Sequence, residues 1–208
     1  MQATGEGNPI LWRLSAALIA ACAWAGLALQ FGLLMGRMGN IAEVTWRLLL
    51  FFTILSNLTV AIIFTLIALG SIRLRHPVLI AGLALTMALV GIVFELLLRK
   101  ALHLSGWNQV TNALLHDIVP LLTVAAWFAL AEKGRLRARD PWIIALFPIA
   151  YLVYALIRGT LEGLYPYPFL DLHKLGWQGV LPTVLGIAVA FLIFGHLMVV
   201  LDRWLGRR

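Results

Sequence analysis

Six long apolar stretches constrain this chain more than any other feature of its sequence. They cover residues 10–35, 48–71, 77–98, 112–131, 142–159 and 177–202. A helix that crosses a membrane needs about 20 mostly apolar residues, so each stretch is long enough to cross. Open strands cannot satisfy their backbone hydrogen bonds in lipid, and these stretches lack the alternation of a β-barrel. The sequence therefore predicts an all-α polytopic membrane protein, a bundle of six transmembrane helices.

The composition leaves no room for a separate soluble domain. Of the 208 residues, 62% are hydrophobic and only 12% are charged, whereas about a quarter of the residues in a soluble domain are charged. We therefore expect one transmembrane domain over residues 1–208, with a loose polar tail at Met1–Asn8. The apolar stretch after this tail is too long for a signal peptide and has no evident cleavage site, so we expect it to be retained. The single cysteine, Cys22, cannot form an intramolecular disulfide.

The chain is basic, with 16 Lys and Arg residues against 9 Asp and Glu. These cations lie between apolar stretches, where membrane proteins use them to fix orientation, so the charge predicts no nucleic-acid partner. With six spans, ten cations fall on the side of the chain termini and six on the other side. The more cationic side is cytoplasmic, which predicts cytoplasmic N- and C-termini and places the connections 36–46, 99–111 and 160–176 outside. All loops are short, so no large soluble partner is expected.

Polar side chains at membrane depth are costly and are functional candidates by default. In the second stretch, Thr53, Ser56 and Asn57 are three or four residues apart, so on a helix they share one face. Thr53 follows Trp46 by seven residues, which in a continuous helix places it about 10 Å inside the outer boundary. Such groups often only join neighbouring helices by hydrogen bonds, and that structural role stays open for Thr53.

The fourth stretch repeats this pattern. Asn112 and His116 are four residues apart in its outer half, while Asp117 is turned about 100° away from His116. Near the outer end of the third stretch, the spacing of Glu95 and Arg99 suits an ion pair. A buried imidazole is harder to explain as structural than a hydroxyl, because it titrates near neutral pH and serves in acid–base chemistry. The polar clusters and the charge count therefore place a candidate site in the same outer half of the bundle.

Thr53 and His116 are residue types that could form a nucleophile–base pair. A hydroxyl is a weak nucleophile until a neighbouring base removes its proton, and imidazole is suited to that task. The two side chains would have to lie within about 3 Å of each other, directly or through one water. Asn57 or Asn112 could donate hydrogen bonds to a developing oxyanion, and Asp117 or an outer-loop residue could orient the imidazole. This mechanism requires no metal or other cofactor.

The last outer connection contains a stiff segment, Tyr165-Pro-Tyr-Pro-Phe-Leu-Asp171. Its two prolines fix φ and push the residues before them to extended geometry. We expect a non-helical element that roofs a cavity, with Tyr167 among the residues that support the site. Its aromatic rings also fit the belt that membrane proteins place at the lipid–water boundary.

Three segments resemble the signature stretches of the androgen-induced protein family and its bacterial membrane relatives. They are Trp46–Asn57 (Trp-Arg-Leu-Leu-Leu-Phe-Phe-Thr-Ile-Leu-Ser-Asn), Asn112–Pro120 (Asn-Ala-Leu-Leu-His-Asp-Ile-Val-Pro) and Leu164–Asp171, and their order and spacing are similar too. The resemblance implies a multi-pass membrane hydrolase with Thr53 as nucleophile and His116 as general base. It further implies lipid ester substrates, of the fatty acid ester of hydroxy fatty acid type, and a bacterial inner membrane as the location.

Other interpretations of the same residues stay open. A small transporter or lipid-binding protein could use Glu95, Arg99, His116 and Asp117 as a proton or ion relay, although the two halves of the chain show no convincing internal repeat of the transporter kind. A zinc site would need about three His, Cys or acidic ligands close together. A haem site would need two histidines at matched depth, and His116 and His196 are expected toward opposite faces of the membrane.

Overall fold

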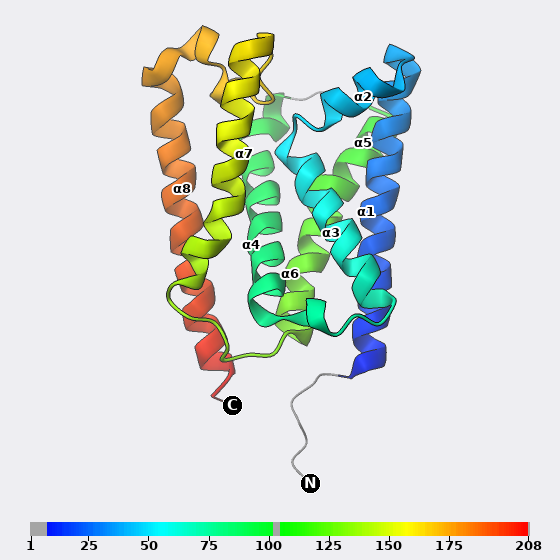
Figure 1. Ribbon diagram of the computed structural model, residues 1–208, viewed down its shortest axis with the longest axis vertical. Coiled ribbons are helices and arrows are strands. Elements are labelled where there is room, and N and C mark those ends of the chain that lie inside the picture. Colours follow the sequence, from blue (N-terminus) through cyan, green and yellow to red (C-terminus); the bar gives the residue numbers. More distant parts are fainter. Residues whose placement is uncertain (1–7, 102–104, 208) are drawn as a thin grey trace.

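The computed structural model describes residues 8–101 and 105–207, which form a bundle of upright helices joined by short connections (Figure 1). Helices are its only regular elements within these residues. Both chain ends lie at one end of the bundle, and α2 lies at the other. The predicted polar tail falls outside the described residues apart from Asn8, whose side chain caps α1. The α-helices are α1 (Pro9–Met38), α2 (Ile41–Leu48), α3 (Phe52–Ala68), α4 (Pro77–Val93), α5 (Trp107–Asn112), α6 (Val119–Leu130), α7 (Asp140–Glu162) and α8 (Leu172–Leu205).

Five helical segments of the described chain are long and apolar enough to cross a membrane. Two of them are composite, because the π-helix Phe94–Leu98 continues α4 and the π-helix Ala113–Ile118 joins α5 to α6. The remaining predicted stretch corresponds to α2 and α3, which pass the same test only as a pair. The prediction of an all-α, multi-pass membrane protein is therefore confirmed. The five segments are Pro9–Met38, Pro77–Leu98, Trp107–Leu130, Asp140–Glu162 and Leu172–Leu205.

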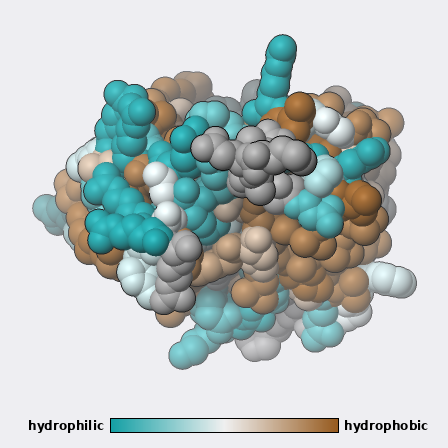
Figure 2. All heavy atoms as spheres, turned by 90° about the horizontal axis from the view of Figure 1, so that it is seen from below, coloured by the Kyte–Doolittle hydropathy of each residue, from teal (hydrophilic) through white to brown (hydrophobic). Residues whose placement is uncertain are grey.

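The outer surface of the bundle suits a lipid surrounding. Large apolar side chains point outward along its length, among them Leu121, Leu161 and Val189, which are 70%, 81% and 56% exposed. Seen from the end that carries the chain termini, hydrophilic side chains gather over part of that end and hydrophobic ones form much of the periphery (Figure 2). Water would penalise so much exposed apolar surface, whereas lipid tails do not.

The second predicted span is not one continuous helix, which corrects the sequence-based expectation. α2 and α3 meet at an angle of 96°, with the break at residues 49–51. Asn40 starts α2 by accepting hydrogen bonds from the backbone N–H groups of Ala42 and Glu43, so a helix begins within the predicted outer connection 36–46. The seven positions from Trp46 to Thr53 therefore do not carry Thr53 down a straight helix. Thr53 is instead the second residue of α3.

The central helix α4 approaches the fourth span closely at Gly91. A Cβ atom added to Gly91 would lie 3.2 Å from the carbonyl oxygen of His116. Small residues allow helix backbones in membranes to approach one another in this way. The absence of a side chain at Gly91 therefore lets the π-helix that carries His116 pack against α4.

Candidate active site

The structure brings Thr53 and His116 together. Thr53 Oγ1 lies 3.2 Å from His116 Nε2, although the two residues are 63 positions apart in the chain. Thr53 is 8% exposed, and both side chains line the same cavity. The distance lies within the hydrogen-bond reach that proton transfer from the hydroxyl to the imidazole requires.

The other ring nitrogen of His116 fixes how the pair is protonated. His116 Nδ1 lies 3.3 Å from the backbone carbonyl oxygen of Asn112. A carbonyl oxygen only accepts hydrogen bonds, so in the neutral ring Nδ1 carries the hydrogen and Nε2 keeps its lone pair. The Thr53 hydroxyl therefore donates to Nε2, which is the arrangement in which the imidazole can act as a base.

Helix geometry and aromatic packing hold the imidazole in place. His116 belongs to the π-helix Ala113–Ile118, a widened turn that occurs frequently at functional sites. Its ring packs against that of Phe94, with centroids 4.1 Å apart and planes inclined by 30°. Phe94 is itself buried, at 2% exposure. The orientation of the ring is therefore set by the fourth span and by the end of α4 together.

The side chain of Asp117 forms an ion pair with another residue and is not bonded to the imidazole of His116. Its carboxylate pairs with Arg99, which also forms the predicted ion pair with Glu95. The guanidinium group of Arg99 lies 5.0 Å from the centre of the Phe94 ring. The orienting role considered for Asp117 thus belongs to the Asn112 carbonyl group, because consecutive residues on a helix point in different directions.

The two asparagines support the pair, in a different way from the one predicted. Asn57 Nδ2 donates to the carbonyl oxygens of Thr53, at 2.9 Å, and of Leu115, at 3.1 Å. Both of its N–H groups are therefore used to join α3 to the π-helix, and neither is left for an oxyanion. Asn112 contacts His116 through its backbone carbonyl group. The expectation of an oxyanion donor is therefore corrected for Asn57, whose amide N–H groups are both used, and stays a prediction for the Asn112 amide.

The start of α3 supplies the hydrogen-bond donors that the asparagines do not. Phe51, the residue before α3, makes no side-chain cap, and the backbone N–H groups of Phe52 and Thr53 face the phenol oxygen of Tyr167. The Thr53 nitrogen lies 3.4 Å from that oxygen. The N-terminus of a helix carries a partial positive charge that favours anions. Burial raises the pKa of Tyr167 above its ordinary value, against the hydrogen bonds from Thr53, so the phenol keeps its proton.

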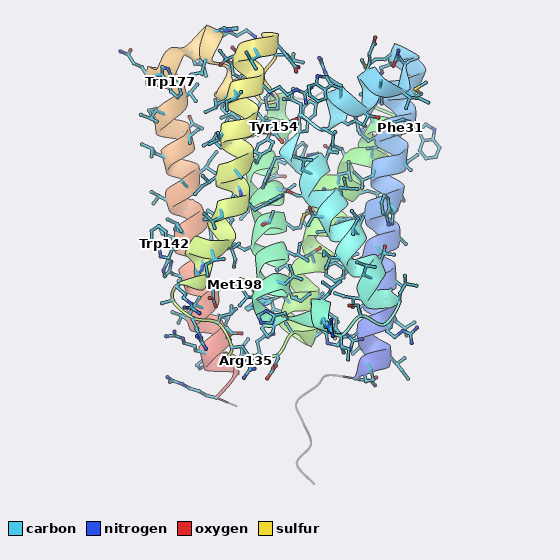
Figure 3. The ribbon with its side chains drawn as sticks, in the orientation of Figure 1. Phe31, Arg135, Trp142, Tyr154, Trp177 and Met198 are labelled. Carbon is cyan, nitrogen blue, oxygen red and sulfur yellow. The ribbon has the colours of Figure 1, made fainter. Side chains whose placement is uncertain are left out.

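Two tyrosines on α7, which the sequence analysis did not single out, hold the break before α3. The Tyr151 hydroxyl donates to the carbonyl oxygen of Leu50 at 3.0 Å, and the Tyr154 hydroxyl donates to that of Leu49 at 3.2 Å. Figure 3 shows Tyr154 pointing from α7 toward this break. Carbonyl groups freed by a helix break need such partners at membrane depth. α7 thereby fixes the backbone just before Thr53.

Arg158 completes this support from the same face of α7. Its guanidinium donates to the Tyr154 hydroxyl at 2.7 Å and pairs with Glu162 at 2.8 Å. It also stacks over Trp46 of α2 at 3.9 Å from the ring centre, and it is 5% exposed. Tyr151, Tyr154 and Arg158 are three and four residues apart, so they lie on one face of the helix. This spacing is the sequence pattern from which their shared role could have been predicted.

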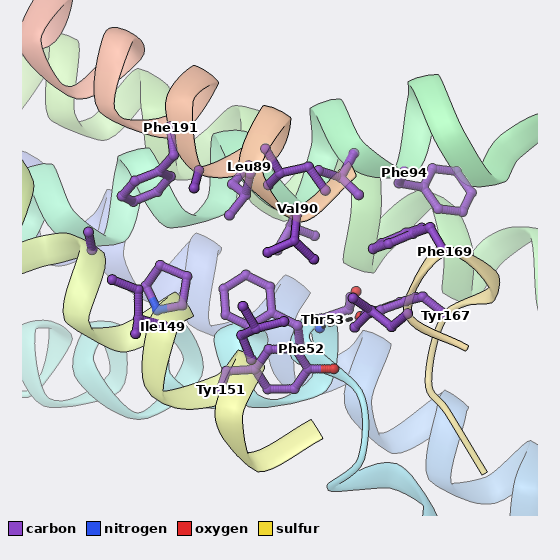
Figure 4. A pocket seen from close by; sticks show the side chains of 18 of the residues that line it. Phe52, Thr53, Leu89, Val90, Phe94, Ile149, Tyr151, Tyr167, Phe169 and Phe191 are labelled. Carbon is purple, nitrogen blue, oxygen red and sulfur yellow. Dashed lines mark hydrogen bonds between the residues drawn. The ribbon is translucent and has the colours of Figure 1, made fainter. Parts of the chain in front are cut away.

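A cavity of about 430 Å³ opens next to Thr53 and His116. Its walls come from α3, α4, α7, α8 and the segment before α8, where Tyr167 and Phe169 stack with their ring planes 4° apart. In the close-up view, Thr53, Tyr167 and Phe169 lie at one end of this cavity and Phe191 lies at the other (Figure 4). The expected roof is thus provided by the Tyr-Pro-Tyr-Pro segment, with a short 3₁₀ turn at Pro168–Leu170.

Searches of protein-family models, of curated proteins and of solved structures find no match to this chain. Within the part of the chain that the structure describes, no three His, Cys, Asp or Glu side chains converge as metal ligands would.

Proposed function

We propose that this protein is an intramembrane hydrolase of lipid esters, with Thr53 as the nucleophile and His116 as the general base. The observation that carries the proposal is the hydrogen bond between Thr53 Oγ1 and His116 Nε2, combined with the Asn112 carbonyl group that leaves Nε2 free to accept a proton. The apolar cavity beside the pair supports a substrate with a long hydrocarbon part. The resemblance of three segments to the androgen-induced protein family supports the same reaction.

The reaction we propose has two steps. Thr53 Oγ1 attacks the ester carbonyl carbon while its proton moves to His116 Nε2, and the bond to the alcohol oxygen then breaks as that oxygen receives the proton from Nε2. The acyl group is left on Thr53. A water molecule next gives a proton to Nε2 and attacks the acyl carbonyl carbon. The bond between that carbon and Thr53 Oγ1 then breaks as Oγ1 takes the proton back from Nε2, which releases the fatty acid and restores the threonine.

The donors at the start of α3 suit the charge that both steps create. Each tetrahedral intermediate carries a negative oxygen, and fixed donors aimed at that oxygen are a major source of catalysis. The Tyr167 hydroxyl and the backbone N–H groups of Phe52 and Thr53 lie beside the nucleophile and are assigned this role.

The proposed chemistry is tested by substitution of the pair in the purified full chain. Thr53→Ala and His116→Ala are both expected to lower hydrolysis of a medium-chain nitrophenyl ester by at least about 10²-fold, the low end for loss of general base catalysis. Labelling of the protein by a fluorophosphonate probe should be lost in Thr53→Ala. The matched control is Thr59→Ala, because this hydroxyl on the same helix donates to the Leu55 carbonyl group of its own helix at 2.8 Å.

Full labelling of Thr53→Ala, with circular dichroism unchanged, would remove the nucleophile assignment. The competing interpretation, a proton relay, predicts a pH-driven flux in liposomes that survives Thr53→Ala. The charged groups it would use, Glu95, Arg99 and Asp117, are paired with one another beside His116, which gives the relay less support than the hydrolase.

A further inference from the structure

The cavity extends far beyond the atoms that the reaction needs. On α7 it is lined from Tyr151, beside the catalytic pair, to Trp142 near the start of the helix. Trp142 and Tyr151 are nine positions apart, which corresponds to about 14 Å at 1.5 Å per residue. The cavity is therefore an elongated space with Thr53 at one end.

The chemistry of its lining changes along this length. Thr53, His116, Tyr151 and Tyr167 supply polar atoms at one end, and the remaining lining side chains are aliphatic or aromatic. Apart from the indole N–H of Trp142, such a surface offers hydrogen bonds to an ester group only near Thr53. An unbranched hydrocarbon chain is the ligand that gains most from the rest, since each methylene group buried contributes about 0.8 kcal/mol.

The end of the cavity away from Thr53 is closed by packed side chains. Phe191 and Ala145 are 4% and 5% exposed and belong to one apolar cluster with Leu85. Beyond this cluster, α7 and α8 come into direct contact, because a Cβ atom added to Gly195 would lie only 2.8 Å from the Cβ atom of Pro141. A ligand that enters from the Thr53 end cannot continue past Phe191 without moving these groups.

One side of the cavity faces the lipid. Leu146 and Ile149 both line it and are 62% and 51% exposed. The gap that they border between α7 and α8 offers a lateral path along which a lipid chain could enter from the bilayer.

Resting on the proposed hydrolase function, we propose that this cavity binds a single straight acyl chain, with its carbonyl carbon at Thr53 and its methyl end against Phe191. Phe191 and Ala145 are then specificity-determining residues that set the longest acyl group the enzyme accepts.

The proposal is tested with nitrophenyl esters from butanoate to palmitate. Phe191→Ala opens the end of the cavity and is expected to raise kcat/KM for palmitate relative to octanoate at least tenfold, because each added methylene group that becomes buried contributes about fourfold. Phe191→Leu should show a smaller change in the same direction. Ala145→Phe fills the cavity end and should move the preference to shorter chains.

Phe194→Ala is the matched control. Phe194 is a phenylalanine on the same helix, three residues further on, and it lines a different groove of the protein, at 48% exposure. Chain-length preference should be the same as in the unaltered protein. A preference that stays unchanged in Phe191→Ala and in Ala145→Phe alike would overturn the proposal.

A binding experiment separates this proposal from the proposed reaction. A fatty acid with a photoreactive diazirine near its methyl end is bound to Thr53→Ala, irradiated, and the labelled residues are identified by mass spectrometry. Labels confined to Phe191, Ala145 and Trp142 support the acyl site even if no ester is hydrolysed, in which case only the hydrolase function fails. Labels spread equally over Phe194 and the other lipid-facing residues of α8 would show that the chain is only surrounding lipid.

Discussion

At the scale of single residues, the imidazole of His116 is oriented by a backbone carbonyl group and not by a carboxylate. In Ser-His-Asp enzymes a buried aspartate fills this position and stabilises the imidazolium ion that forms. Here the Asn112 carbonyl oxygen takes that position at 3.3 Å, and the adjacent Asp117 is paired with Arg99. The Asn112 carbonyl group thus favours the tautomer with the hydrogen on Nδ1, which the proposed base catalysis requires, without a carboxylate hydrogen-bonded to the ring.

This difference makes a prediction for Asp117→Asn. The corresponding substitution in a Ser-His-Asp triad lowers kcat by about 10⁴-fold because the wrong tautomer forms. In this protein the tautomer is set by Asn112, so we expect a loss of less than roughly tenfold, caused by the weakened contact with Arg99. Steady-state kinetics with one ester substrate measure this loss of kcat. A loss near that of His116→Ala would mean that Asp117 acts on the imidazole.

Removal of the Tyr167 hydroxyl is expected to lower kcat. Tyr167→Phe keeps the ring that stacks on Phe169 and removes only the hydroxyl beside Thr53. Loss of one oxyanion donor costs about 10² to 10³ in kcat, and we expect a loss of this order with little change in KM.

The control for this substitution is Tyr165→Phe. Its hydroxyl lies 3.2 Å from that of Thr160, outside the catalytic pair, so kcat should stay within a few fold of the unaltered value. An equal loss in both variants would indicate a general disturbance of the loop.

Spacing in the sequence was enough to single out Thr53 and His116, which the structure places 3.2 Å apart, because each belongs to a cluster of polar residues three or four positions apart. It could not show what their neighbours do. Asn57 has two N–H groups, and which carbonyl oxygens they reach depends on Leu115 of another helix. Contacts of that kind are decided only by how the helices pack.

At the scale of elements, the break between α2 and α3 is the feature that makes the site. It places Thr53 at the start of a helix, where backbone N–H groups have no partner within the helix and face the Tyr167 hydroxyl instead. The motif from Asn40 to Glu43, an N-cap followed three residues later by an acidic residue, signals the start of α2 in the sequence. Hydropathy hides the break itself, because residues 48–55 are nearly all apolar and only the tyrosines of α7 reveal why the chain turns there.

The contact between α7 and the loop that carries Tyr167 can be tested through Gly159. A Cβ atom added to Gly159 would lie 2.3 Å from the Tyr165 ring, so Gly159→Ala must displace the loop. We expect it to lower stability by about 1 to 3 kcal/mol, the usual effect of overpacking, and to reduce ester hydrolysis. Thermal unfolding in detergent and steady-state rates measure the two effects.

Gly186→Ala provides the comparison. Nothing lies within 4 Å of a Cβ atom added to Gly186 on α8, and alanine in a helix interior is favoured over glycine by about 0.5 to 1 kcal/mol. This variant should therefore be as stable as the unaltered protein or more so. If it were destabilised as much as Gly159→Ala, the loop contact would not be the cause.

At the scale of the whole molecule, the two chain ends lie at one end of the bundle, and α2 and the connection from α7 to α8 lie at the other (Figure 1). Hydropathy predicts six spans, and the described chain has five helical segments that can cross alone and a sixth only if α2 and α3 together form one bent span. The direction of insertion rests on the excess of cations near the chain ends. We predict that both chain ends are cytoplasmic and that the catalytic pair opens toward the opposite side.

Cysteine labelling checks this orientation. In a Cys22→Ser background, a membrane-impermeant maleimide applied from outside should label Lys174→Cys, whose side chain is 81% exposed. It should label Arg137→Cys, an exposed position in the loop between α6 and α7, only after the membrane is opened. The reverse pattern would invert the predicted topology.

The candidate site draws on segments spread across most of the chain, and this bears on how such a protein is made. The threonine emerges from the ribosome early, at position 53, its base follows at position 116, and the tyrosines that hold the break and close the cavity come only with residues 151–167. Membrane insertion of the early helices alone leaves an incomplete centre. On the proposed function, a chain inserted only as far as α6 lacks the donors and the cavity walls that the reaction needs, so hydrolysis begins only once α7 and the segment that carries Tyr167 are in place.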